Sequence, residues 1–355
     1  MLSILEEYEV RKSRYESYAK SLRSLLDSLI IGEGLNVHSI SSRVKDKKSL
    51  EGKIKSKGTY NEIDEITDIV GVRIITHFSN EVDLIAEVIE REFDVDRINS
   101  IDKRSTLEPD RFGYLSLHYI VSLANNRCRL KEYLPYENFK AEIQIRSILQ
   151  HTWAEIEHDI GYKSAVEVPS HIKRKFSRLA GLLELADDEF VSIKDSLSKY
   201  AINIAHEMQE NPKNKDITLD KISYHEYLKQ SPLIKSLISD LFEKTGVELI
   251  MQFPEITHAI KQLHYNGIIS ISDLDDAFSE YREKVMKRAI KALKRLKELG
   301  TSEISSAVLG IYLSQAMAAR NNNKDEMIEF LNTASSRRPR NADALAQELL
   351  DTFNE

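Results

Sequence analysis

The chain has 355 residues, of which 41% are hydrophobic and 30% are charged, and this ordinary globular composition excludes a chain that is disordered throughout. It carries 50 Lys and Arg against 57 Asp and Glu, a net charge of −7, so a nucleic-acid site would require a local basic patch. The single cysteine, Cys128, excludes an internal disulfide framework and a cysteine-rich zinc site.

The N-terminal sequence indicates neither a secretion signal nor a membrane anchor. MLSILEEYEV is acidic too early for a signal peptide. No apolar run along the chain approaches the roughly 18 residues that a membrane span needs. We therefore expect a cytoplasmic protein with no membrane partner.

The first part of the chain has the mixed periodicity of an α+β domain. Apolar residues at steps of three and four predict helices, and short β-branched or alternating runs predict strands. The predicted elements are helices over 1–31 and 81–92 and strands over 69–75, 93–101, 114–123 and 139–146. The last strand has a strictly polar face, which is either a solvent edge or a functional site, formed by Lys140, Glu142, Gln144 and Arg146.

After Ser147 the pattern is almost wholly helical. A helix is predicted from Pro169 to about Met208, and the polar segment 211–216 is the best candidate for a linker. Further helices are predicted over 232–244, 254–266, 272–299, 303–320, 325–335 and 341–353. We therefore predict an α+β domain over 1–210 and an all-helical domain over 218–355.

A basic cluster lies between Arg43 and Lys57. It holds seven cations and two anions, so its local net charge is 7 − 2 = +5 in an acidic chain. One interpretation is a solvated loop; the other is a cradle for a polyphosphate, because Lys and Arg make charge-assisted hydrogen bonds to phosphate oxygens.

Two carboxylates lie at or next to predicted strands. Asp68 precedes the strand 69–75, and Glu142 lies on the polar face of 139–146. If the two strands are neighbours, this pair could hold Mg²⁺, which prefers oxygen ligands and substrate phosphates; taken singly, each is an ordinary surface group. Tyr114, at the start of another strand, could stack on a base or lie in the core.

Six motifs in order together resemble the synthetase domain of the RelA/SpoT alarmone-synthetase family. The resemblance covers about 40–165. The motifs are Ser-Arg43-Val-Lys45-(x)3-Ser49-(x)3-Lys53, Asp68-Ile-Val-Gly-Val-Arg73, Gly113-Tyr114-Leu-Ser-Leu-His118, Glu142-Ile-Gln144-Ile-Arg146, His151-Thr-Trp153-Ala-Glu-Ile-Glu157-His158 and Tyr162-Lys163.

The resemblance implies a nucleotidyltransferase-like fold, with a mixed β-sheet flanked by helices. It also implies an ATP-dependent pyrophosphokinase that moves the β,γ-diphosphate of ATP to a nucleotide 3′-hydroxyl, with GDP or GTP as the expected acceptor and Mg²⁺ as cofactor. Only about 40 residues precede the motifs, so we expect no hydrolase domain of the kind that long family members carry.

The resemblance also assigns roles to individual residues. The adenine would lie between Arg43 and Arg73. The ATP phosphates would be held by Lys45, Ser49 and Lys53. Catalysis and Mg²⁺ binding would rest on Asp68 and Glu142, with Glu142 also a candidate base. The acceptor side would be lined by Tyr114, His118, Gln144 and Arg146.

The sequence departs from the family pattern beside Gly113. Asp110 stands where a lysine is usual and Leu115 where an arginine is usual, so cations expected at the acceptor's 5′-phosphates are missing. The alternative is therefore a toxic relative that pyrophosphorylates the 3′ end of tRNA or an adenosine nucleotide. Its C-terminal domain would then act as an inhibitor or as a sensor of a protein trigger. Small family members are often oligomers, so a homo-oligomer is also an open prediction.

The C-terminal part offers two motifs with two interpretations each. A basic stripe on the predicted helix 272–299 is either a solvated face or a contact for tRNA or a nucleotide; it consists of Lys284, Lys287, Arg288, Lys291, Lys294 and Arg295. The cations Arg337, Arg338 and Arg340 could extend it. The pair Tyr224 and Tyr227 is either core or a plug for a nucleotide site.

Overall fold

The computed structural model describes residues 3–58, 60–102, 116–159, 169–210, 217–252, 256–334 and 341–354. The chain divides into two compact units, Met1–Lys194 and Asp195–Glu355, named unit 1 and unit 2 below. The predicted domains 1–210 and 218–355 stay a prediction. The predicted linker 211–216 lies outside the described residues.

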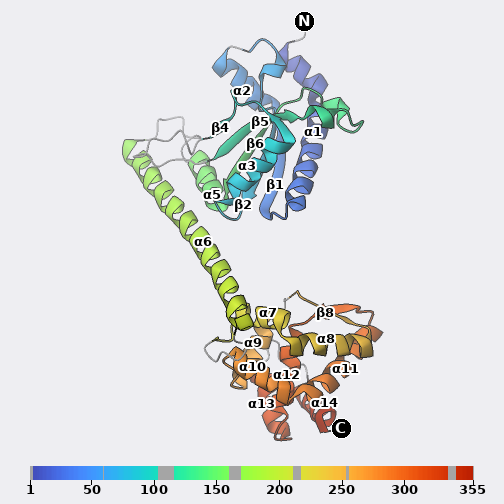
Figure 1. Cartoon of the computed structure of the whole chain (residues 1–355). Coiled ribbons are helices and arrows are strands. Elements are labelled where there is room, and N and C mark those ends of the chain that lie inside the picture. Colours follow the sequence, from blue (N-terminus) through green and yellow to red (C-terminus); the bar gives the residue numbers. More distant parts are fainter. Residues whose placement is uncertain are drawn as a thin grey trace. The chain divides into compact units, whose positions relative to one another are not determined.

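Unit 1 contains a six-stranded mixed sheet in the order β1-β2-β6-β5-β3, with β4 paired to β5 (Figure 1). The strands are β1 (Val37–Val44), β2 (Val70–Thr76), β3 (Phe93–Val95), β4 (Ile101–Asp102), β5 (Leu117–Leu123) and β6 (Ala141–Ser147). β2 and β6 are parallel, and the other pairs are antiparallel. Since β6 lies between β2 and β5, its polar face is not at the edge of the sheet.

Helices α1 (Ile4–Gly32) and α3 (Glu81–Glu92) cover the apolar face of this sheet. A capping box at Ser3 and Glu6 starts α1, and the buried rings of Tyr8, Tyr15 and Tyr18 come from its inner side. These side chains pack with alternate residues of β2, β5 and β6, for example Val72 and Ile143. The intervening residues of these strands therefore point to the opposite face, where polar side chains gather.

The remaining elements of unit 1 connect or flank the sheet. They are the helices α2 (Lys47–Lys57), α4 (Asn125–Cys128) and α5 (Ile148–Glu157), the 3₁₀ turns η1 (Ile63–Glu65) and η2 (Leu134–Tyr136), and α6 (Ser170–Glu210), which continues past the end of unit 1. Within the described part of the chain, no helix is long and apolar enough to cross a membrane.

The prediction of a mixed sheet flanked by helices is confirmed, with two local errors. The segment 93–101 is not one strand, because Asn99 bonds through its backbone and side chain to Asp96, and the resulting turn separates β3 from β4. The strand β1 was not predicted. It pairs on one side only, and Ile40 is its single buried residue, so it lacks an apolar pattern.

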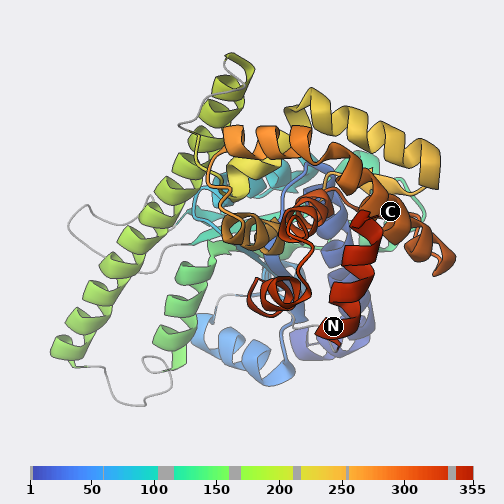
Figure 2. The same ribbon diagram turned by 90° about the horizontal axis from the view of Figure 1, so that it is seen from below.

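The described residues of unit 2 form helices and two short strands, β7 (Glu248–Ile250) and β8 (Glu303–Ser305), which make a parallel pair. Its helices are α7 (Lys221–Gln230), α8 (Pro232–Thr245), α9 (Ile256–Tyr265), α10 (Ile271–Glu280), α11 (Arg282–Glu298), α12 (Val308–Ala318), α13 (Lys324–Thr333) and α14 (Ala342–Asn354). Figure 2 shows them from below, with α14 in red next to the C-terminus.

Most helices of unit 2 were predicted, but α7 and β7 were not, and two predicted helices were wrong in extent. The segment 272–299 forms α10 and α11, which are separated at Tyr281. The segment 303–320 begins with β8 and becomes helical only at Val308. Most residues of α12 are buried because the helix packs within the core of the unit. Its sequence is therefore largely apolar on all sides and not amphipathic.

The tyrosine pair of α7 belongs to the core of unit 2. Tyr224 is 0% exposed; its hydroxyl donates to the Ala307 carbonyl at 3.1 Å and accepts the Gly310 N–H at 3.0 Å. Tyr227 is 4% exposed and donates to Asp275 at 2.9 Å. Both rings therefore have a structural function within this unit.

Two cations of the basic stripe of α11 bond to neighbouring helices of unit 2. Arg288 donates to Gln315 at 2.9 Å and lies over the Tyr312 ring, and burial lowers the pKa of its guanidinium. Lys291 donates to Thr352 at 2.8 Å. These two cations hold α12 and α14 against α11. The predicted extension at Arg337, Arg338 and Arg340 lies outside the described residues.

Candidate active site

The polar face of the sheet collects most of the residues predicted for the site. The parallel register of β2 and β6 places Glu142 beside Gly71 and Gln144 beside Arg73. The antiparallel register of β5 and β6 places His118 beside Gln144. Residues paired in this way point to the same face of the sheet. The three strands thus bring side chains far apart in the sequence onto one surface.

A chain of hydrogen bonds runs across this surface and fixes Glu142. His118 Nδ1 lies 2.9 Å from Glu142 Oε1, and Gln144 Nε2 donates to Glu142 Oε2 at 2.9 Å. Arg146 Nη2 in turn donates to Gln144 Oε1 at 2.5 Å. Both carboxylate oxygens of Glu142 are therefore oriented by neighbours, and four predicted site residues form one connected network.

This network keeps Glu142 ionised although its side chain is only 19% exposed. Burial alone would raise the pKa of the carboxyl, and the charge of Asp68 would also raise it. The hydrogen bonds from His118 and Gln144 outweigh both effects and hold the pKa of Glu142 below its usual value. The carboxylate is thus available as a charged acceptor at neutral pH.

Asp68 lies in the turn immediately before β2 and forms ion pairs with two lysines that were predicted to bind the ATP phosphates. Its Oδ2 lies 3.0 Å from Lys45 Nζ and 2.7 Å from Lys53 Nζ. Lys45 follows β1, where its N–H donates to the Ile69 carbonyl, and Lys53 belongs to α2. Burial opposes ionisation of Asp68, but the two ammonium groups outweigh it, so its pKa lies below the usual value.

The two arginines predicted for adenine lie diagonally on neighbouring strands. Arg43 of β1 is opposite Gly71 of β2, and Ser41 is opposite Arg73. The Arg43 side chain crosses over Gly71, where an added Cβ would lie 3.6 Å from Arg43 Cγ. Arg73 Nη1 forms an ion pair of 3.0 Å with Glu155 Oε1 of α5. Both guanidinium groups therefore arise from one face with a glycine between them.

One predicted site residue is not joined to these clusters, and another lies outside the described part of the chain. The Ser49 hydroxyl donates to Asp46 at 2.7 Å, within the N-cap of α2, so it serves the start of that helix. Tyr114 lies outside the described residues, as do the neighbouring Asp110 and Leu115 that distinguish this sequence.

The region 42–167 matches the model of a region found in RelA/SpoT proteins. The chain is 35% identical over 157 residues to "GTP pyrophosphokinase YwaC" of Bacillus subtilis (strain 168), an alignment that covers 43% of this chain and 71% of that protein. This chain belongs to the RelA/SpoT family. It is also 27% identical over 164 residues to "GTP pyrophosphokinase YjbM" of the same organism, over 45% of this chain and 73% of that protein.

Among solved structures, the small alarmone synthetase 2 from Bacillus subtilis has 29% sequence identity and a TM-score of 0.46, covering 54% of this chain and 100% of that chain. The sequence motifs had placed the RelA/SpoT resemblance at about 40–165, and the family match confirms it.

Two polar residues at the RelA/SpoT site received no role from the sequence. His151 and Glu155 are one turn apart on α5, and Glu155 is the ion-pair partner of Arg73. Burial lowers the pKa of His151, and the charges of Arg73 and Arg146 lower it further, so this imidazole is neutral at neutral pH. The spacing of four residues within the fifth motif was the signal that could have identified the pair.

The carboxylates fit the Mg²⁺ that the RelA/SpoT resemblance implies. Asp68 Oδ1 is buried and has no hydrogen-bond partner among the described residues, so this oxygen is available as a ligand. No group of three or more His, Cys, Asp or Glu suited to a metal occurs in the described part of the chain. Asp68 and Glu142 would therefore share the ion with phosphate oxygens of a substrate, the arrangement that Mg²⁺ prefers.

Proposed function

We propose that this chain is an ATP-dependent pyrophosphokinase that transfers the β,γ-diphosphate of ATP to a nucleotide 3′-hydroxyl, with GDP or GTP as acceptor. The observation that carries the proposal is the common surface of two clusters, Asp68 with its lysines and Glu142 with its hydrogen-bonded network. The activity printed in the names of the relatives YwaC and YjbM supports it.

In the proposed reaction, the acceptor 3′-oxygen forms a bond to the β-phosphorus of ATP. The bond from that phosphorus to the oxygen bridging the α- and β-phosphates breaks, and AMP leaves. The proton of the hydroxyl passes to Glu142. The side chains mainly position the reactants and neutralise charge, as in other transfers of phosphoryl groups.

The donor side of the proposed site is cationic. The ammonium groups of Lys45 and Lys53 converge on one partly buried carboxylate, and the same groups would bind the ATP phosphates by charge-assisted hydrogen bonds. The planar guanidinium groups of Arg43 and Arg73 would enclose the adenine, since such groups stack on aromatic rings. Bound Mg²⁺ would neutralise charge that develops on the phosphate oxygens.

The acceptor side is the Glu142 network. An ionised carboxylate with both oxygens oriented accepts a hydrogen bond from the attacking hydroxyl and takes its proton as the bond to phosphorus forms. Arg146 and His118 flank this position and would meet the acceptor's phosphates and ribose.

The deciding experiment is incubation of the full chain with Mg²⁺ and γ-³²P-ATP in the presence of GDP, GTP, AMP, ADP or bulk tRNA. Label in a guanosine tetra- or pentaphosphate, with equimolar AMP, supports the proposal. Label on tRNA or on an adenosine nucleotide replaces the guanosine acceptor with the alternative drawn from Asp110 and Leu115. An absence of AMP release with every acceptor refutes pyrophosphate transfer.

A further inference from the structure

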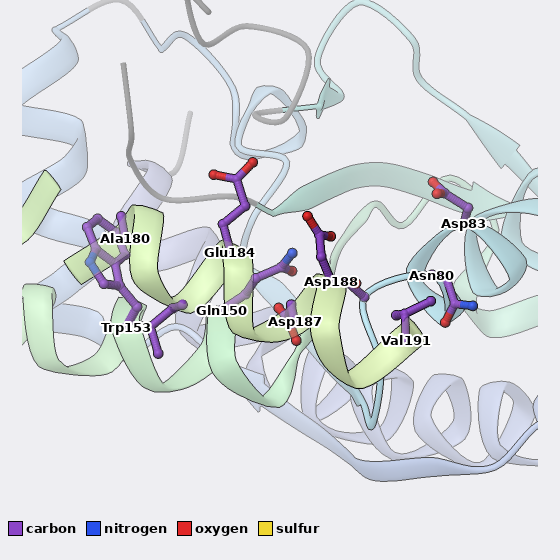
Figure 3. Close-up of a pocket in the computed structure, with 11 residues that line it drawn as sticks. Asn80, Asp83, Gln150, Trp153, Ala180, Glu184, Asp187, Asp188 and Val191 are labelled. Carbon is purple, nitrogen blue, oxygen red and sulfur yellow. The ribbon is translucent and has the colours of Figure 1, made fainter. Parts of the chain in front are cut away.

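Helix α6 makes a buried polar contact with the strand that carries the site. Asp187 is 4% exposed, and its Oδ2 accepts a hydrogen bond of 2.6 Å from the hydroxyl of Ser147, which is 0% exposed. Figure 3 shows Asp187 beside Gln150, between α5 and α6, at a cavity of about 410 Å³ within unit 1. The reaction proposed above does not use this carboxylate.

Ser147 is the junction at which β6 becomes α5. Its hydroxyl accepts the Gln150 N–H at 3.1 Å, while its own N–H donates to the Gln150 side chain at 3.0 Å, which completes a capping box. One hydroxyl therefore donates to Asp187 and accepts from α5, so the first turn of α5 and the middle of α6 are held through a single atom.

Site residues lie on both sides of this junction. Arg146 immediately precedes Ser147 and ends the network that orients Glu142. His151 lies about one turn into α5, and Glu155, one turn further along, binds Arg73. A rotation of α5 about its cap would move the partner of Arg73, and a shift of Ser147 would move Arg146.

Burying a carboxyl group to make this one contact costs free energy. Burial raises the pKa of Asp187, the nearby Asp188 raises it further, and only the Ser147 hydrogen bond opposes them. An apolar side chain could fill the same position without that penalty but could not accept the Ser147 proton. The contact thus contributes a fixed geometry at the junction.

We propose that Asp187 is a positioning residue for the active site, which acts through Ser147 to fix the β6–α5 junction and thereby Arg73 and Arg146. This inference rests on the proposed function, because its consequence is the binding of ATP and of the acceptor. Asp187 touches no reacting atom.

The test compares Asp187→Ala, Asp187→Asn and Ser147→Ala in the full chain, with Asp188→Ala as the matched control. Asp188 is the adjacent carboxylate on the same helix, and it is exposed. For Asp187→Ala and Ser147→Ala, we expect KM for ATP to rise by about 5- to 30-fold, the factor for losing one buried hydrogen bond. Asp187→Asn should stay near wild type because its amide oxygen still accepts from Ser147.

Two further measurements separate positioning from a merely structural role. The double variant Asp187→Ala/Ser147→Ala should be no worse than either single variant, since both remove the same contact. Trp153 is the only tryptophan of the chain and lies on α5, so its emission should shift in Asp187→Ala and not in Asp188→Ala. A lower Tm with unchanged KM and emission in the folded fraction would overturn the inference.

Binding of a non-hydrolysable α,β-methylene analogue of ATP keeps the two proposals distinguishable. If the wild-type chain binds the analogue but transfers nothing to any acceptor, the proposed function fails, and the inference is judged on the Kd of the analogue in the same variants. If the analogue binds equally to wild type, Asp187→Ala and Ser147→Ala, the inference fails even when the enzyme is active.

Discussion

The substitution Glu142→Gln separates the chemistry of the site from its stability. The glutamine side chain has the same shape but no charge, and it can accept through one oxygen only. In the wild-type chain, Glu142 Oε2 accepts a hydrogen bond from Gln144 Nε2, and Glu142 Oε1 lies within hydrogen-bond distance of His118 Nδ1. With its oxygen toward Gln144, the new amide would donate to His118, which can accept after a change of tautomer.

The hydrogen bonds of Glu142→Gln can therefore be completed, so the free energy of unfolding should fall by no more than about 1 kcal/mol. The rate should fall far more. A positioned general base contributes about 10²- to 10⁴-fold, which equals about 2.7–5.4 kcal/mol of transition-state stabilisation. Loss of a metal ligand would add to this effect.

The assay is AMP release from ATP with the acceptor identified above, together with thermal unfolding of the same samples. Glu87→Gln is the matched control, because Glu87 is an exposed carboxylate on α3 that faces away from the site. A Glu142→Gln enzyme within threefold of wild type would refute the role of Glu142. A loss of rate equal to the loss of folded protein would refute the separation argued here.

Three further predictions follow from single contacts. Lys53→Met removes the 2.7 Å partner of Asp68, so the pKa of Asp68 should rise, and KM for ATP should increase by about tenfold in initial-rate assays. The pKa of Asp68 is depressed in the folded state, so the ionised carboxylate contributes to stability above its unfolded pKa of about 4, and this contribution is lost as pH falls through the folded pKa. Acid unfolding of Lys53→Met should therefore depend less on pH in that range. An unchanged unfolding curve would contradict this. Tyr224→Phe leaves the Gly310 N–H and the Ala307 carbonyl without their partner, so unit 2 should lose about 1–3 kcal/mol in denaturant unfolding, an effect that an unchanged midpoint would exclude.

Local pattern was sufficient for much of the fold. The apolar period of α1, the β-branched run of β2 and the strict alternation of β6 each follow from which residues must face a core, and the structure confirms them. The polar face of β6 was likewise recognisable in the sequence, because a row of polar residues alternating with apolar ones indicates either a solvent edge or a functional site. The ordered motifs identified the family because several spacings had to agree at once.

Other features depend on contacts between segments far apart in the sequence. The edge strand β1 has too little apolar character to be predicted, and it forms because β2 offers a free edge. That the polar face of β6 does not lie at an edge of the sheet was decided only when β2 and β5 paired on both sides of the strand. The ion pairs of Lys45 and Lys53 with Asp68 likewise depend on the tertiary structure.

The sequence by itself thus determined most of the elements, the family and the candidate residues of the site, since these follow from periodicity and motif spacing along one chain. The tertiary structure alone decided which side chains form hydrogen bonds and ion pairs with one another. It removed Tyr224 and Tyr227 from the candidate binding residues by burying them in the core, and it engaged Arg288 with Gln315 and the Tyr312 ring. It brought Asp187 to Ser147 across 40 positions, because hydrogen bonding depends on distance in space and not on separation along the chain.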